Sequence, residues 1–158
     1  MLIIVALGLF LAGISVWPAV AEIDFLVSIV WGEQAPTHEL HLFLLKAKQG
    51  LIETEAKYPF ILYGLDWLAF AHIALAILFA GAITDPVRNK WIVQCGLIMC
   101  FGVAILAAVF VPIRGLPKIW FLFDVFFAIA AIPLVVALLD IKFLEKTHKI
   151  YPNNELNE

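Results

Sequence analysis

The chain has 158 residues, of which 64% are hydrophobic and 15% charged, with a formal net charge of −3 and a mean hydropathy of +1.01. Soluble domains are about half apolar and about a quarter charged, and a small one buries only roughly two-thirds of its surface, so these values exclude a soluble fold. The sequence has no basic run outside a loose cluster near its end, which excludes a nucleic-acid partner. The composition predicts one all-α domain over residues 1–158, with the lipid bilayer as its first partner.

The first predicted element is an uncharged apolar run from Met1 to about Val20. About 20 such residues cross the roughly 30 Å of a bilayer's hydrocarbon core. Residues 18–21 also resemble a signal-peptidase site, but no Lys or Arg precedes the apolar run, as a cleavable signal normally requires. We therefore favour an uncleaved anchor over a removed signal peptide.

Residues 21–59 form the only extramembrane segment of any size. Pro36-Thr37 indicates a helix start, and apolar residues then recur at helical spacing as far as Ala56. This pattern predicts an amphipathic helix on the bilayer surface or over the mouth of the bundle. His38 and His41 share a face at its start and could hold one metal ion, but Leu42 and Leu45 stand at the next helical steps. We therefore predict no metal site there.

Three further spans are predicted at residues 60–83, 91–111 and 119–139, with aromatic residues at several ends as in interfacial belts. Thr84-Asp85-Pro86 is expected to open the third helix as its cap, and residues 112–117 to form a tight hairpin. Cys95 and Cys100 lie on different faces of one span, so we expect no disulfide. The predicted fold is a four-transmembrane-helix bundle with one interfacial helix and a polar, disordered tail over residues 142–158.

Orientation depends on the basic residues outside the spans. If the N-terminus is cytoplasmic, each side of the membrane carries five Lys or Arg residues, which is a tie under the positive-inside rule. The signal-like first span favours both termini in the cytoplasm. We therefore expect a multi-pass protein of the cell membrane, the inner membrane of a bacterium.

Asp66, His72 and Asp124 are ionisable side chains inside predicted spans, where charge is costly and marks function by default. His72 and Asp124 lie on stripes of small residues, where membrane helices approach one another closely, so both should face the bundle interior. Tyr63 and Trp120 stand one turn before the two aspartates, and Arg114 lies on the same side of the membrane. We predict a polar funnel that binds a ligand, formed by Tyr63, Asp66, His72, Arg114, Trp120 and Asp124.

Two interpretations of the funnel stay open. In the structural one, an aspartate pairs with Arg114, the other meets interfacial water, and His72 bonds a helix carbonyl. In the functional one, the funnel is a pocket or proton path with His72 as the titrating group, because histidine changes charge nearest neutral pH. Asp85 and Arg88, on the opposite side, are interpreted as a cap and a lipid anchor.

Three stretches, Tyr63–His72, Asp85–Trp91 and Pro112–Pro117, resemble a group of uncharacterised small four-helix integral membrane proteins of Bacteroidetes-type bacteria. The resemblance covers roughly residues 30–140 and implies a four-helix bundle without an activity. A weaker similarity, carried by Asp85-Pro86 and Trp91, runs to sterol-isomerase-like and sigma-2-receptor-like membrane bundles, which place acidic residues inside four helices.

Three functions compete at this point, of which a proton-coupled transporter has the least support, because the chain lacks the inverted repeats and broken helices of transporters. The first is a binding protein for a lipid or quinone-like molecule, or an accessory subunit of a larger membrane complex, either of them open to forming a homo-oligomer. The second is a membrane enzyme on a lipid-soluble substrate, in which His72, Asp66 and Asp124 transfer protons. The sequence has no nucleophile motif, phosphate-binding loop or haem-attachment motif, and it assigns no cofactor.

Overall fold

The computed structural model describes residues 1–148, except for the side chains of Phe123, Phe126, Phe127 and His148. Over this range the chain is all-helical, which confirms the all-α part of the predicted fold. The elements are α1 (Leu2–Ser15), α2 (Ala19–Val30), α3 (Glu39–Lys57), α4 (Pro59–Thr84), α5 (Lys90–Ile113), α6 (Lys118–Phe127), the 3-10 turn η1 (Ala128–Ala130) and α7 (Ala131–His148).

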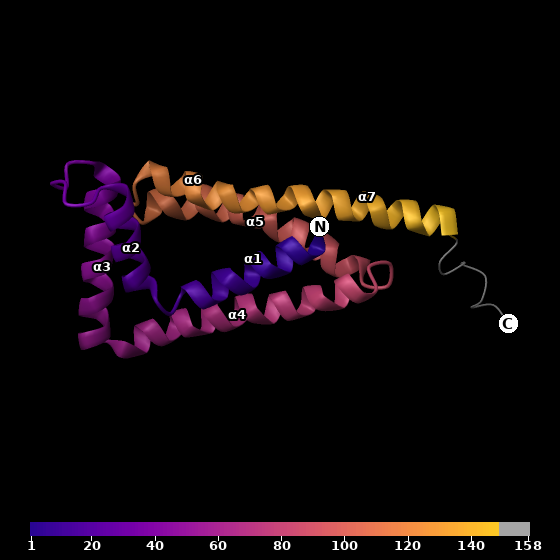
Figure 1. The fold of residues 1–158 in the computed structure, drawn as a ribbon, viewed down its shortest axis with the longest axis horizontal. Helices are drawn as coiled ribbons and strands as arrows, with labels where there is room; N and C mark the ends of the chain where they lie inside the picture. Colours follow the sequence, from indigo (N-terminus) through magenta and orange to yellow (C-terminus); the bar gives the residue numbers. More distant parts are fainter. Residues whose placement is uncertain (149–158) are drawn as a thin grey trace.

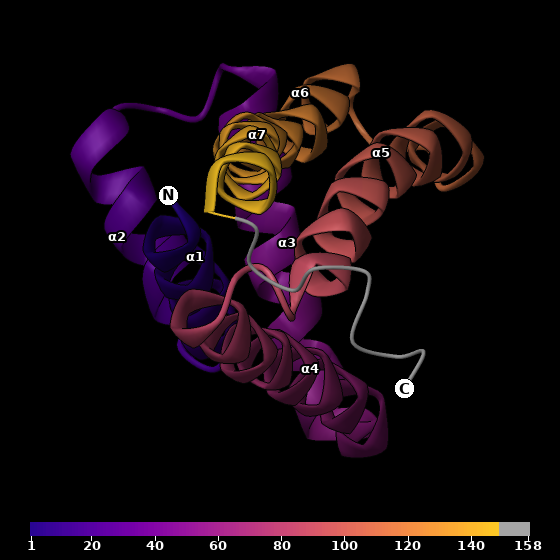
Figure 2. The same cartoon turned by 90° about the vertical axis from the view of Figure 1, so that its right-hand side faces the viewer.

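The long helices lie along one common axis, and two shorter helices cross them at one end (Figure 1). Along the long axis, α4 runs out, α5 returns, and α6 with α7 runs out again as one rod. Helix α1 lies between α4 and α7 and packs along α4. Helices α2 and α3 stand across the end where α4 and α6 begin, and Figure 2 shows α4 and α6 at opposite edges of the bundle.

Two helices, α4 with 26 residues and α5 with 24, are long and apolar enough to cross a membrane. Their ends lie within two residues of the predicted spans. A third crossing is reached if α1 and α2, bent by 101°, count as one broken span. The described part of the chain thus has two to three candidate spans, which fits a membrane protein.

The predicted span from Met1 to about Val20 is not one continuous helix, because the chain turns sharply after Ser15. Pro18 lacks a backbone N–H and its ring clashes with a continuing helix, and α2 starts anew behind it, with Glu22 N donating to Pro18 O at 2.8 Å. Helix α1 has 14 residues, about 21 Å at 1.5 Å per residue. We call the turn over residues 16–18 the elbow.

The turn before α5 also differs from the prediction. Helix α5 begins at Lys90, so Asp85 does not cap it. Instead, Asp85 Oδ1 accepts a hydrogen bond from Arg88 N at 3.0 Å, and the Asn89 amide donates to the carbonyls of Gly81 and Asp85. The side chains therefore stabilise a tight turn over residues 85–89.

The last predicted span is helical but interrupted, since α6 ends at Phe127 and a 3-10 turn joins it to α7. Helix α7 continues to His148, so the first seven residues of the predicted polar tail are helical, and the remainder lies outside the described residues. An ion pair between Lys90 Nζ and Glu145 Oε2, at 2.8 Å, ties α7 to the start of α5.

The core joins α1, α4, α5 and α7 through eight buried apolar residues, namely Leu2, Val5, Phe79, Ala82, Val93, Leu134, Ala137 and Ile141. Two glycines allow the helices to approach closely. A Cβ on Gly13 would lie 2.9 Å from Ala69 O, and one on Gly96 would lie 2.7 Å from Phe79 Cζ. Cys95 and Cys100 are half-buried free thiols.

Candidate functional site

A pocket lies where the elbow meets α3 and the start of α4. Its cavity volume is about 380 Å³, within the range of about 300–1,000 Å³ that small-molecule sites occupy. We call it the elbow pocket, and its lining consists of Val16, Trp17, Ala19 and Val20 from the elbow and α2, Leu51 and Glu55 from α3, and Pro59, Leu62, Tyr63, Leu65 and Asp66 from α4.

One hydrogen bond joins the two sides of this pocket. Trp17 Nε1 donates to Asp66 Oδ1 over 3.1 Å, between residues 49 positions apart in the chain. Asp66 lies seven residues after the start of α4, about 10 Å along the helix axis. Helix α4 exceeds the hydrocarbon thickness by about 9 Å. With that excess shared equally by its two ends, Asp66 lies about 6 Å inside the hydrocarbon core, roughly one turn below the boundary where tryptophan and tyrosine gather.

The charges of the lining have one sign. Glu55 and Asp66 are acidic, the lining contains no Lys, Arg or His, and Tyr63 adds a hydroxyl group. Both acids are exposed, so water and ligands can reach them. Carboxylates accept hydrogen bonds and attract cations, and aromatic faces attract ammonium groups. The pocket therefore suits a molecule whose polar end donates hydrogen bonds or is positively charged, with an apolar part beside the valines and leucines.

His72 is half-buried between α4 and α1 and is not among the lining residues. Its Nδ1 lies 2.8 Å from the carbonyl oxygen of Leu68, one turn earlier on the same helix. A Cβ added to Gly13 of α1 would lie 3.2 Å from His72 Cβ. The histidine thus bonds a helix carbonyl, as the structural interpretation expected.

The other predicted site residues gather elsewhere. Arg114 is exposed at the end of α5, and Asp124 is half-buried on α6. Trp120 contacts Phe43 of α3 edge to face, with ring centroids 5.1 Å apart. Because α6 and α4 lie at opposite edges of the bundle (Figure 2), five of the six residues form two groups, and His72 belongs to neither. Tyr63 and Asp66 share the elbow pocket, whereas Arg114, Trp120 and Asp124 stand near the hairpin before α6.

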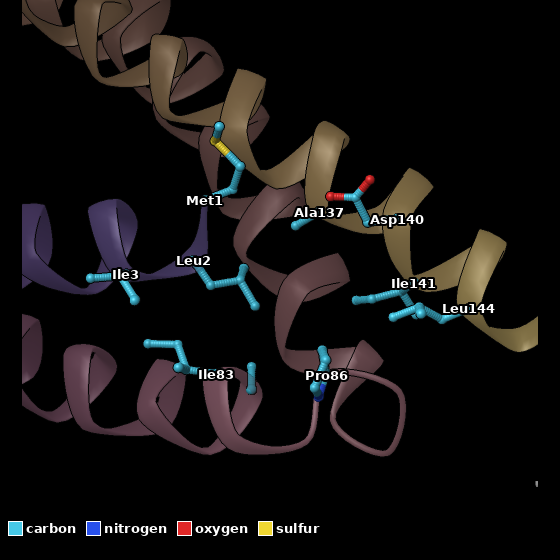
Figure 3. Close-up of a pocket in the computed structure, with 10 residues that line it drawn as sticks. Met1, Leu2, Ile3, Ile83, Pro86, Ala137, Asp140, Ile141 and Leu144 are labelled. Carbon is cyan, nitrogen blue, oxygen red and sulfur yellow. The ribbon is translucent and has the colours of Figure 1, made fainter. Parts of the chain in front are cut away.

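A second, smaller hollow lies at the opposite end of the molecule (Figure 3). Its volume is about 230 Å³, and it lies between the start of α1, the end of α4 and α7. Asp140 is its one charged lining residue, and Leu2, Ala82 and Ile141 belong to the core. This hollow is a gap at the edge of the core and offers little polar chemistry to a ligand.

The two histidines at the start of α3 have structural surroundings. His38 caps the helix, since its Nδ1 accepts a hydrogen bond from Leu40 N at 3.2 Å. His41 is 3% exposed and stacks on Trp31 with ring centroids 4.7 Å apart. Its buried Nδ1 has no hydrogen-bond partner. Within residues 1–148 no three metal-ligating side chains come together.

Sequence reasoning missed Trp17 and Glu55 as parts of the site. Trp17 lies near the end of the first apolar run and Glu55 near the end of the predicted amphipathic helix, and neither position indicates a pocket. The signal that could have found them is Pro18, which ends α1 and directs Trp17 towards the start of α4. No family model, curated protein or solved structure matches this chain, so the resemblance to bacterial four-helix membrane proteins stays a prediction.

Proposed function

We propose that the chain is a small membrane-embedded binding protein, acting alone or as an accessory subunit of a larger membrane complex. Its ligand is an amphiphile whose polar end donates hydrogen bonds or carries positive charge, such as a quinol or an amine-headed lipid. The observation that carries this proposal is the elbow pocket, with two carboxylates, a tryptophan and a tyrosine above an apolar wall.

The chemistry of the lining decides which polar ends fit. A quinone presents two carbonyl acceptors, and these find few donors beside Glu55 and Asp66, whereas a quinol or an ammonium group pairs with either carboxylate. An anionic lipid headgroup would face two like charges. The ligand can also compete with Trp17 for Asp66, because their hydrogen bond is exposed to solvent.

Ligand-induced stabilisation of the purified protein in detergent tests this specificity. The probes are decylubiquinol against decylubiquinone, and lysophosphatidylethanolamine against lysophosphatidylglycerol. A probe at 100 times its Kd stabilises the folded state by about 2.7 kcal/mol. We expect the quinol or the ethanolamine lipid to raise the unfolding temperature and its counterpart to leave it unchanged.

Two variants separate the pocket from a general detergent effect. Asp66→Asn keeps a side-chain oxygen for the Trp17 indole but removes the negative charge, so we expect an intact fold and loss of the probe response. Glu53→Gln removes the same charge from an exposed position of α3 outside the lining and should respond like wild type. Equal responses of all three proteins to every probe would contradict the proposal.

The alternative is a membrane enzyme in which His72 and an aspartate transfer protons. Its geometry has less support, because Nδ1 of His72 is taken up by the Leu68 carbonyl and Asp66 is bonded to Trp17. His72→Ala separates the two roles. An enzyme should lose turnover and keep its stability, whereas a structural histidine should lose stability and keep ligand binding.

We propose that four helical segments cross the membrane. Helices α4 and α5 form the second and third crossings, α6 with α7 forms the last, and α1 forms a short first crossing. Support comes from α6 and α7, which follow one direction on either side of the 3-10 turn, and from α1 lying alongside α4 (Figure 1). Both termini then lie on one side, which we propose is the cytoplasm of a bacterial cell. Alkaline phosphatase fused after residue 148 should be inactive, and fused after residue 35 active. The reverse pattern would overturn this orientation.

A further inference from the structure

Helix α2 presents a broad apolar face that α3 leaves uncovered. At about 100° per residue, Ala21, Phe25, Leu26, Ile29 and Val30 occupy one half of the helix circumference. Phe25 and Ile29 are each 67% exposed, Val30 53% and Leu26 44%. No residue of this 12-residue helix is buried. Side chains of this size need a covering other than water.

The other half of α2 is taken up by α3. Asp24 is paired with Lys48 Nζ of α3 at 2.5 Å, and Trp31, just after α2, stacks on His41 of α3. Figure 1 places α2 on the side of α3 that is turned towards the long helices. The polar contacts of α2 thus lie on the half that faces α3, whereas the other half carries the exposed apolar side chains together with Glu22.

The direction of α2 excludes a crossing by this helix. It is bent by 101° from α1, and α1 runs along the candidate span α4. Its 12 residues extend about 18 Å, short of the roughly 30 Å hydrocarbon core. The elbow before it also lies beside Asp66, about 10 Å along the axis from the start of α4.

We propose that α2 is an in-plane membrane anchor, with its face of Phe25, Leu26, Ile29 and Val30 seated in lipid at the boundary between headgroups and acyl chains. Because α2 bends by 101° from α1, and α1 packs along the candidate span α4, the uncovered face belongs to a helix that runs across the direction of the spans, which argues for lipid over a protein partner. Glu22 is the one charged residue in that half. It lies in the first turn, where an acidic side chain also suits the helix dipole. The start of α2, through Ala19 and Val20, then forms one wall of the elbow pocket in the membrane interface.

Nitroxide depth measurements on Glu22→Cys and Ile29→Cys test this placement. Residues seven apart lie on nearly the same side of a helix and are separated by about 10 Å along its axis. The variants are made in a chain with Cys95→Ala and Cys100→Ala and placed in liposomes at high dilution. Collision with oxygen and with a nickel chelate then reports the depth of each label.

The bend of 101° tilts α2 by 11° from the perpendicular to α1. Over the roughly 10 Å of helix axis between the labels, this tilt changes depth by about 2 Å, so an in-plane helix should place both labels within about 2 Å of the same depth. Both should be more accessible to oxygen than to nickel. A depth difference of about 10 Å would show that α2 is part of a broken span. Access of nickel to both labels would show that the face is exposed to water, and exclusion of both reagents would show that a protein partner covers it. Each of these results overturns the proposal.

Two controls separate this inference from membrane insertion itself. A label at Phe101, on the exposed face of α5, should be accessible to oxygen, and one at Lys46, exposed on α3, to nickel. Failure at Phe101 would overturn the membrane placement of α5 as well. If the chain without cysteines does not fold, a photoreactive phenylalanine analogue at Ile29 of the natural chain replaces the labels. It should crosslink to lipid, and crosslinking to protein would overturn the proposal.

Discussion

Replacing Gly13 by alanine tests how closely α1 packs on α4. An added Cβ would lie 2.9 Å from both Ala69 O and Ile73 Cγ1, and 3.2 Å from His72 Cβ, where ordinary contacts begin at 3.4 Å. One of these neighbours is backbone, so α1 must move away from α4. Overpacking of this kind costs about 1–3 kcal/mol, which is roughly a 5- to 150-fold rise in the unfolding equilibrium constant.

Gly8→Ala is the matched control on the same helix. Nothing lies within 4 Å of a Cβ at Gly8, and alanine is favoured over glycine by up to about 1 kcal/mol inside a helix. We expect this variant to be neutral or stabilised.

Unfolding by SDS in mixed micelles, followed by tryptophan fluorescence, measures both variants. Gly13→Ala should unfold at lower SDS and should also lose the probe response of the elbow pocket, because the same shift separates Trp17 from Asp66. If the two alanine variants behaved alike, α1 would not approach α4 in this way and the reasoning would be refuted.

Two further predictions follow from α5. Gly96→Ala should destabilise the protein by about 1–3 kcal/mol, since its Cβ would meet Phe79 Cζ at 2.7 Å, whereas Gly102→Ala, with open space around it, should not; equal SDS midpoints would refute this. Glu145→Gln breaks the ion pair between Glu145 (33% exposed) and Lys90 (28% exposed). The loss in unfolding free energy should stay below about 1 kcal/mol, and a larger loss in the same SDS titration would show that the pair is more than a surface contact.

The sequence predicted helices best where composition and length agree. Helices α4 and α5 were expected to within two residues, because long apolar runs bounded by Pro59 and by the polar turn at 85–89 leave few alternatives. Helix α3 was expected from its apolar spacing. These features are local, so a single sequence contains them.

The elbow escaped prediction because the sequence stays apolar on both sides of it. Hydropathy alone does not distinguish a straight span over Met1–Val20 from a short helix followed by a second one at 101°. Pro18 was interpreted as part of a cleavage-site pattern rather than as a helix break. The physical effect that decided the outcome is the missing N–H of proline.

Two residues that line the elbow pocket were expected from the sequence, and two were not. Asp66 was expected because charge inside a span needs an explanation, and Tyr63 because it stands one turn before Asp66; both line the elbow pocket. The partners Trp17 and Glu55 depend on where the elbow and α3 meet α4, which residue spacing does not report. Asp66 and Asp124 were joined because each follows an aromatic residue by one turn, but this pattern does not report which edge of a bundle a helix occupies.

Native mass spectrometry, on protein prepared gently from the membranes of the cell that makes it, tests the proposed ligand most directly. That ligand is an amphiphile whose polar end donates hydrogen bonds or is positively charged, bound in the elbow pocket. Wild type and Glu53→Gln should each carry one discrete bound mass, and Asp66→Asn should lack it. Heterogeneous bulk lipid on all three proteins, or the same discrete mass on Asp66→Asn, would contradict the account.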